Sequence, residues 1–148
     1  MTEQTSTRSV VVERDLPHPP EKVWRALTQA RLMDEWLMSN DFQPVVGHRF
    51  NFRAPPMAHW NGVTDCEVLV DEPCTRLAYS WNASGEEAVN GVKTIVTWTL
   101  TPAGAGTHVR MEQSGFRADQ EANYRGAVYG WQKFVGALEN VVRGLDDR

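Results

Sequence analysis

The C-terminal part of the chain constrains the fold more than any other segment, because it predicts one long amphipathic helix. Residues 119–145 contain no proline. A helix of this length with a single apolar face needs an extended apolar surface to cover it. The apolar side chains that recur there, at alternating steps of four and three, are Tyr124, Val128, Trp131, Val135, Leu138, Val142 and Leu145.

Gly126 and Gly130 lie within the first half of this helical pattern, although a glycine in the middle of a helix costs about 1 kcal/mol relative to alanine. Gly130 is open to two interpretations: a kink that opens the mouth of a cavity, or close packing of the helix against its neighbours. Gly126 weakens the same side of the helix. Mobile first turns are therefore a further hypothesis.

The chain ahead of this helix is predicted to consist mainly of strands. Residues 8–16 are rich in β-branched side chains, which is typical of a strand. Residues 17–37 then predict two short helices, and Pro19 and Pro20 suit the start of the first. Alternating apolar residues predict five more strands, at 45–53, 63–70, 77–81, 96–100 and 107–116.

A run of strands followed by a helix indicates an α+β fold. An antiparallel meander has one face for the core and one for water, and the long helix has an apolar face of matching length. We therefore predict a curved antiparallel sheet of about six strands wrapped around the C-terminal helix, with two short helices after the first strand. Residues 1–7 are expected to form a flexible tail, and residues 8–146 a single domain.

Charge and composition argue against several classes of function. The formal net charge is -4 and the basic residues are scattered among acids, so no nucleic-acid-binding patch is expected. The sequence shows no signal peptide and no apolar run long enough to span a membrane, which favours a cytoplasmic protein without membrane insertion. Cys66 and Cys74 form no metal-binding motif with the four histidines, so we expect neither a metal site nor a required disulfide.

Short motifs spread over residues 8–145 carry a family resemblance by their order and spacing. They are VWRALT at 23–28, WL at 36–37, GHRFNF at 47–52, RLAYSW at 76–81, VTWTL at 96–100, GT at 106–107, SGF at 114–116 and GW at 130–131. Together they resemble the helix-grip fold of the START-like (SRPBCC) superfamily, which includes polyketide cyclases, lipid-transfer domains and the birch-pollen allergen type. Within it, the chain is similar to the family of homologues of the activator of the ninety-kilodalton heat-shock protein ATPase.

The resemblance implies a ligand cavity between the curved sheet and the long helix. Such pockets are mainly apolar, and Trp and Tyr suit a ring-containing or acyl ligand. Trp60 is included as the apolar contact of a lid at residues 55–60, a segment that equally suits an exposed crossover loop. The predicted ligand-binding residues are Phe50, Phe52, Trp60, Tyr79, Trp81, Trp98, Met111, Gln113, Tyr124, Val128 and Trp131.

Two polar residues on the predicted inner face each have two interpretations. Gln113 shares the face of Val109 and Met111, so its amide either orients a ligand's carbonyl or hydroxyl, or bonds to backbone at the cavity rim. In many relatives the residue at this position, before Ser-Gly, is histidine. His48 shares the face of Phe50 and is either a cavity residue or a structural residue of the rim.

The leading hypothesis is therefore a protein that binds a small hydrophobic or aromatic molecule and uses no cofactor. The first alternative is a stress-response module that contacts a chaperone, as the activator resemblance implies, although in the eukaryotic activators this fold is one of two domains. The second alternative is a polyketide-cyclase-like enzyme. No paired carboxylates, Ser–His–Asp set or Cys with a nearby base supports a catalytic site, and Asp65 and Glu67 are expected on the outer face of their strand. A homodimer is left open.

Overall fold

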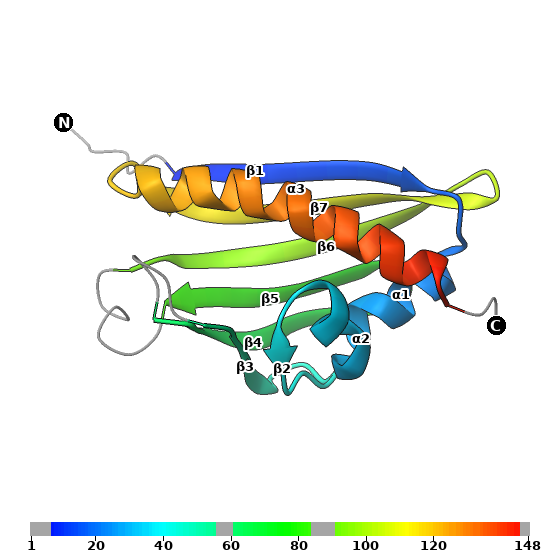
Figure 1. The fold of residues 1–148 in the computed structure, drawn as a ribbon, viewed down its shortest axis with the longest axis horizontal. Helices are drawn as coiled ribbons and strands as arrows, with labels where there is room; N and C mark the ends of the chain where they lie inside the picture. Colours follow the sequence, from blue (N-terminus) through cyan, green and yellow to red (C-terminus); the bar gives the residue numbers. More distant parts are fainter. Residues whose placement is uncertain (1–6, 56–60, 84–90, 146–148) are drawn as a thin grey trace.

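The computed structural model describes residues 7–55, 61–83 and 91–145. They form one seven-stranded antiparallel sheet, with the strand order β1-β7-β6-β5-β4-β3-β2, and three helices that lie on one face of it (Figure 1). The elements are β1 (Thr7–Leu16), α1 (Pro20–Thr28), α2 (Ala30–Trp36), β2 (Ser39–Asn40), β3 (Arg49–Arg53), β4 (Val63–Glu72), β5 (Arg76–Ala83), β6 (Lys93–Ala103), β7 (Gly106–Arg117) and α3 (Glu121–Arg143).

The pairing of the first strand with the last one determines where the long helix lies. β1 and β7 are antiparallel neighbours, with Val10 opposite Gln113. α3 follows β7 and runs back along β1 and β7 until its C-terminal end reaches α1 and α2 (Figure 1). The predicted α+β architecture, with two short helices after the first strand, is confirmed.

Within the described residues the sheet has seven strands, whereas about six were predicted. β2 consists of two residues and pairs with the end of β3, with Asn40 opposite Phe52. A strand of this length is too short to produce an alternating pattern that could be recognised in the sequence.

The prediction of a strand at 45–53 is wrong for its first half, because β3 begins only at Arg49. Val45 and Val46 are 56% and 60% exposed. Gly47 follows them with a φ of 92°, a left-handed conformation that belongs to a turn and that glycine adopts without strain. The β-branched residues Val45 and Val46 therefore lie outside the strand that their sequence pattern indicates.

Alternation along the strands sets the inner face of the sheet as predicted. On β4, Thr64, Cys66 and Val68 are buried, whereas Asp65 is exposed on the outer face. The buried inward series of β6 and β7 comprises Val96, Trp98, Leu100, Val109, Met111 and Gln113.

The apolar face of α3 is covered along only part of its length. Its buried side chains are Trp131, Val135, Leu138 and Val142. Tyr124 is half-buried and Val128 is 39% exposed, so the expectation that Val128 points inward is wrong. The short helices α1 and α2 reach α3 only near its C-terminal end (Figure 1). Among the described helices, none combines the length and the hydropathy needed to cross a bilayer.

Candidate functional site

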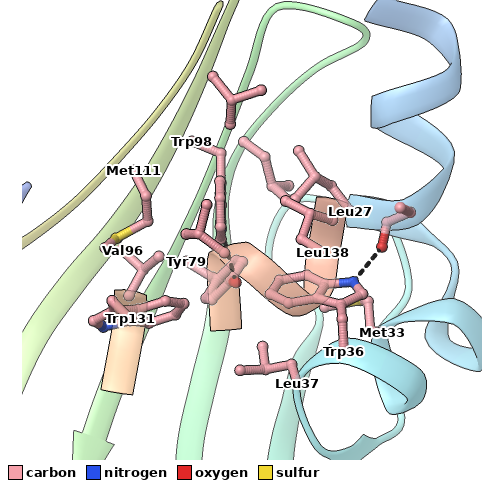
Figure 2. Close-up of a cluster of buried hydrophobic side chains, with 14 of the residues drawn as sticks. Leu27, Met33, Trp36, Leu37, Tyr79, Val96, Trp98, Met111, Trp131 and Leu138 are labelled. Carbon is pink, nitrogen blue, oxygen red and sulfur yellow. Dashed lines mark hydrogen bonds between the residues drawn. The ribbon is translucent and has the colours of Figure 1, made fainter. Parts of the chain in front are cut away.

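A cluster of tryptophan rings lies between the inner face of the sheet and α3. Trp98 of β6 packs edge-on against Trp36 of α2, with ring centroids 5.5 Å apart, and against Trp131 of α3 at 5.9 Å. Trp131 in turn lies 5.2 Å from Trp81 of β5. Figure 2 shows Trp131, Trp98 and Trp36 around Tyr79, so residues from four elements meet in one aromatic cluster.

A second group of rings continues this cluster toward β3. Phe52 lies 5.3 Å from Trp81 and 6.0 Å from Tyr79. Phe50 lies 5.7 Å from Tyr79 and 5.3 Å from Phe52. The structure thus brings together the predicted ligand-binding aromatics of the strands. The loop residue Trp60 lies outside the described residues, as does most of the predicted lid.

The buried indole and phenol groups of the cluster are bonded to each other. The Nε1–H of Trp98 donates to the Tyr79 hydroxyl at 3.1 Å. Burial raises the pKa of Tyr79 well above its ordinary value, although the bond from Trp98 offsets part of the shift. Tyr79 is therefore a neutral phenol, and no residue in the described ranges accepts its hydroxyl proton.

Gln113 is the centre of a hydrogen-bond relay that crosses three strands and the helix. Its Oε1 accepts the Nε1–H of Trp131 at 2.6 Å, and its Nε2–H donates to Thr94 Oγ1 at 2.9 Å. Thr94 Oγ1 donates to the backbone carbonyl of Trp81 at 2.8 Å. Gln113 is only 2% exposed and it bonds to the side chains of Trp131 and Thr94, so the interpretation as a rim residue bonded to backbone is wrong. Sequence alternation placed Gln113 inside the sheet, but nothing in the sequence pointed to Trp131 or Thr94 as its partners.

Most of the candidate residues are part of the packed core. Phe52, Tyr79, Trp98 and Met111 have no exposed surface, and Phe50 and Trp131 have almost none. Beside Trp131, the half-buried Trp81 and Phe134 leave part of the cluster accessible. We call this region, together with the half-buried Ala127 one turn before Trp131 on α3, the open end.

Tyr124 and Val128 lie apart from this open end. They line a shallow groove of about 860 Å³ along α3, together with Glu121, Arg125, Tyr129, Gln132 and Lys133. The Arg8 guanidinium lies over the Tyr124 ring, 3.9 Å from its centroid.

His48 is a structural residue near the edge of the sheet. Its Nε2 is 2.9 Å from the carbonyl oxygen of Asp41, and its ring stacks on Phe50 with centroids 6.1 Å apart. These contacts agree with the structural interpretation of His48.

The two thiols are protonated at neutral pH. Burial, with the nearby Asp65 and Asp41 carboxylates, raises the pKa of the Cys66 thiol. Burial and Glu21 also raise the pKa of Cys74. Among the described residues, no group of three His, Cys, Asp or Glu side chains is arranged to hold a metal ion.

The glycines of α3 are not explained by close packing. A Cβ atom on Gly126 would have no neighbour within 4 Å, and one on Gly130 would touch only the Phe134 ring at 3.8 Å, an ordinary contact. Neither glycine has a positive φ. The close-packing interpretation of Gly130 is therefore wrong, and α3 continues through both positions without interruption.

A histidine on the outer face of the sheet gives the protein a pH-dependent contact. His108 Nδ1 lies 2.7 Å from an oxygen of Asp15, and its Nε2 lies 2.7 Å from an oxygen of Glu13. Both ring nitrogens can donate only in the imidazolium form. The bonds to Asp15 and then to Glu13 accordingly raise the pKa of His108 above 6.5.

We expect the His108 ring to titrate above pH 6.5 in an NMR titration of the folded protein. Because the folded-state pKa is the higher one, the stabilisation is fully present below the unfolded pKa and is lost as pH rises through the folded value. The unfolding midpoint of the wild type should therefore fall slightly as pH rises from 6.5 through the folded-state pKa of His108. This fall should be absent in the His108→Gln variant. Added salt should move the titration back toward 6.5, since the group is exposed; a midpoint at or below 6.5 in low salt would contradict the assignment.

Comparisons with known proteins agree with this fold. A family model for Activator of Hsp90 ATPase homolog 1-like protein matches residues 17–143. Protein MLL2253 from Mesorhizobium loti is 54% identical in sequence, and its crystal structure has a TM-score of 0.86 over 94% of this chain and 99% of that one. None of the curated proteins matches the chain.

Two more distant structures share the architecture. DynU16, a protein in the dynemicin biosynthetic locus, is 25% identical with a TM-score of 0.75, over 92% of this chain and 47% of that one. The Aha1 dimer from Colwellia psychrerythraea is 20% identical with a TM-score of 0.76, over 91% and 96% of the two chains. At this level of identity the Aha1 likeness concerns the fold alone.

Proposed function

The chain belongs to the family of Activator of Hsp90 ATPase homolog 1-like proteins, and from this premise we propose that it binds a small, uncharged, largely aromatic molecule at the open end of its aromatic cluster. The half-buried Trp81 beside Trp131 carries the proposal. An aromatic ligand stacked there would extend the chain of ring contacts that links Trp131, Trp98 and Trp36.

Hydrogen-bonding groups near the open end suggest the chemistry of the ligand. In the described part of the chain, the indole N–H of Trp81 has no partner, and the hydroxyl proton of Tyr79 has no acceptor. Both unused groups are donors, and none of the predicted ligand-binding residues is charged. The best match is a neutral ligand that carries an acceptor oxygen, such as a ketone.

The dense packing limits where such a ligand sits. Trp98, Tyr79 and Phe52 are in contact with other rings and leave no exposed surface. A ligand therefore first contacts Trp81 and Phe134, and reaches Tyr79 only if the Trp131 ring moves. Gln113 acts on binding through its bond to Trp131, because both atoms of its amide already have partners.

Replacing Trp81 tests the site. With prodan, an uncharged naphthyl ketone, as fluorescent probe, Trp81→Phe should weaken binding about five-fold through loss of one neutral hydrogen bond of about 1 kcal/mol. Trp81→Ala, which also removes the ring, should weaken it by more than ten-fold. Fluorescence titration of the purified full chain gives both dissociation constants.

Two controls make this test specific. Trp24→Phe alters a half-buried tryptophan of α1 outside the candidate site and should leave prodan binding unchanged. N-phenylnaphthylamine, which lacks an acceptor oxygen, should lose affinity with Trp81→Ala but not with Trp81→Phe. Equal prodan affinity in wild type and Trp81→Ala would rule out the open end as the site.

Native mass spectrometry of freshly purified protein addresses the natural ligand. A mass above that of the chain, which disappears on denaturation, would support the proposal and identify the ligand's class. Absence of any such mass, combined with no binding of prodan, would contradict it.

A protein-binding function is a second candidate, and an exposed aromatic residue favours it. Tyr129 is 75% exposed and lies beside Val128 in the groove along α3. Its position would suit a partner such as a chaperone, in line with the family's description. ATP-dependent recovery of a chaperone by wild type, but not by Tyr129→Ala, would support this function.

A further inference from the structure

The two halves of α3 are held to the sheet very differently. All its buried side chains, from Trp131 to Val142, lie in the C-terminal half. Residues 121–130, which we call the strap, contain no buried side chain. Figure 1 shows the strap running alongside β1 and β7, away from α1 and α2.

Fixed points lie at both ends of the strap. Just before it, the buried Gln120 donates to the carbonyl of Gly91 at 3.1 Å and accepts the backbone N–H of Arg117 at 2.9 Å. Just after it, Trp131 is bonded to Gln113 and packed among the other rings.

The contacts between these two points are made by exposed or half-buried side chains. Glu121 pairs with Arg8, and the two side chains are 49% and 42% exposed. The half-buried Tyr124 packs edge-on against Phe116 with ring centroids 5.6 Å apart, and its hydroxyl is 3.5 Å from the carbonyl of Ser9. Exposed ion pairs contribute little stability, and the other contacts are those of Tyr124, whose ring centroid also lies 3.9 Å from the Arg8 guanidinium. We therefore expect the strap to be less stable than the rest of α3.

The two glycines of the strap lower its helical stability further without any steric need. Alanine would fit at Gly126 and Gly130, and neither position requires a positive φ. Alanine is the better helix former, because glycine has more backbone freedom to lose on folding. Glycine at both positions therefore favours local opening of the strap.

We infer that the strap opens and recloses between Gln120 and Trp131, and that its opening admits the ligand to the aromatic cluster under α3. The second part of this inference rests on the binding function proposed above. Opening would separate Tyr124 from Phe116 and free the flank of Trp131, while the C-terminal half of α3 stays in place.

Hydrogen exchange on the full chain without ligand tests the opening itself. The backbone N–H groups of residues 125–130 make helix bonds, as do those of residues 134–142. We expect the first group to exchange at least ten-fold faster. Equal protection in the two groups would overturn the inference, whether or not any ligand binds.

A double variant then links opening to binding. Gly126→Ala with Gly130→Ala should slow exchange in residues 125–130 about 25-fold, from about five-fold for each glycine. The association rate of prodan in stopped-flow fluorescence should fall by a similar factor, because a probe that has contacted Trp81 and Phe134 reaches the flank of Trp131 only while the strap is open.

Gly136→Ala is the matched control, since it makes the same change in the anchored half, where the added Cβ would meet only Arg14 at 3.8 Å. It should alter neither exchange in residues 125–130 nor prodan association. Slower exchange with an unchanged association rate would overturn the strap as the ligand's route. If prodan binds no variant, the proposed function fails with this probe, and the exchange rates alone still support or overturn the opening.

Discussion

Trp98→Ala is expected to lower the free energy of unfolding by about 3–5 kcal/mol, the usual cost of truncating a buried aromatic side chain to alanine. Trp98 has no exposed surface and touches the rings of Trp36 and Trp131. Its removal also takes away the donor that bonds to the Tyr79 hydroxyl. Urea denaturation of wild type and variant measures the loss.

Trp98→Phe and Trp24→Ala provide the controls. Trp98→Phe retains part of the packing and should cost less than Trp98→Ala, whereas Trp24→Ala removes a half-buried ring at the edge of the core. A loss of under about 1 kcal/mol for Trp98→Ala would mean that the cluster rearranges to fill the space, contrary to a close-packed interior.

The same residue is unsuited to testing ligand binding. A substitution at Trp98 that destabilises the core also leaves a cavity, and apolar cavities in proteins bind small aromatic molecules. Trp98→Ala could thus gain affinity for a probe that the wild type binds elsewhere. Trp81, at the solvent-accessible end of the cluster, separates binding from stability better.

Alternation and helical periodicity predicted the inner face of this fold because both follow from local geometry. The burial of Trp98 on β6 and of Val135 on α3 was evident from their spacing alone. Periodicity does not show how far along a helix the neighbouring elements extend. Val128 has the right spacing, but the short helices cover only the other end of α3.

Contacts between distant segments could not be predicted from the sequence. Gln113 was placed inside by alternation, but Trp131 and Thr94 reach it only because α3 folds back over β7 and β6 lies beside β7. The open end was missed for the same reason, since it depends on half-buried side chains of β5 and α3. Bonds to Trp131 and Thr94 occupy both polar atoms of the Gln113 amide, so we propose that Gln113 positions Trp131.

The Gln113 relay supports a second large effect: Gln113→Leu should lower the free energy of unfolding by about 1–3 kcal/mol, the cost of leaving a buried donor without a partner. The unpaired group would be the indole N–H of Trp131, which is 2% exposed. Thr94 Oγ1 would also lose the hydrogen bond that it accepts from Gln113, while it would still donate to the carbonyl of Trp81. Urea denaturation measures the change.

A double-mutant cycle with Trp131→Phe distinguishes the hydrogen bond from general packing. Phenylalanine has no N–H, so Gln113→Leu should cost less in the Trp131→Phe background than in wild type. The expected coupling between the two sites is about 0.5–3 kcal/mol, the range found for residues in direct contact. Strictly additive losses would show that the 2.6 Å bond between Trp131 and Gln113 contributes nothing of its own. Trp131 also borders the open end. A nonadditive cycle would therefore further predict that Gln113→Leu weakens prodan binding, although Gln113 itself does not contact the probe.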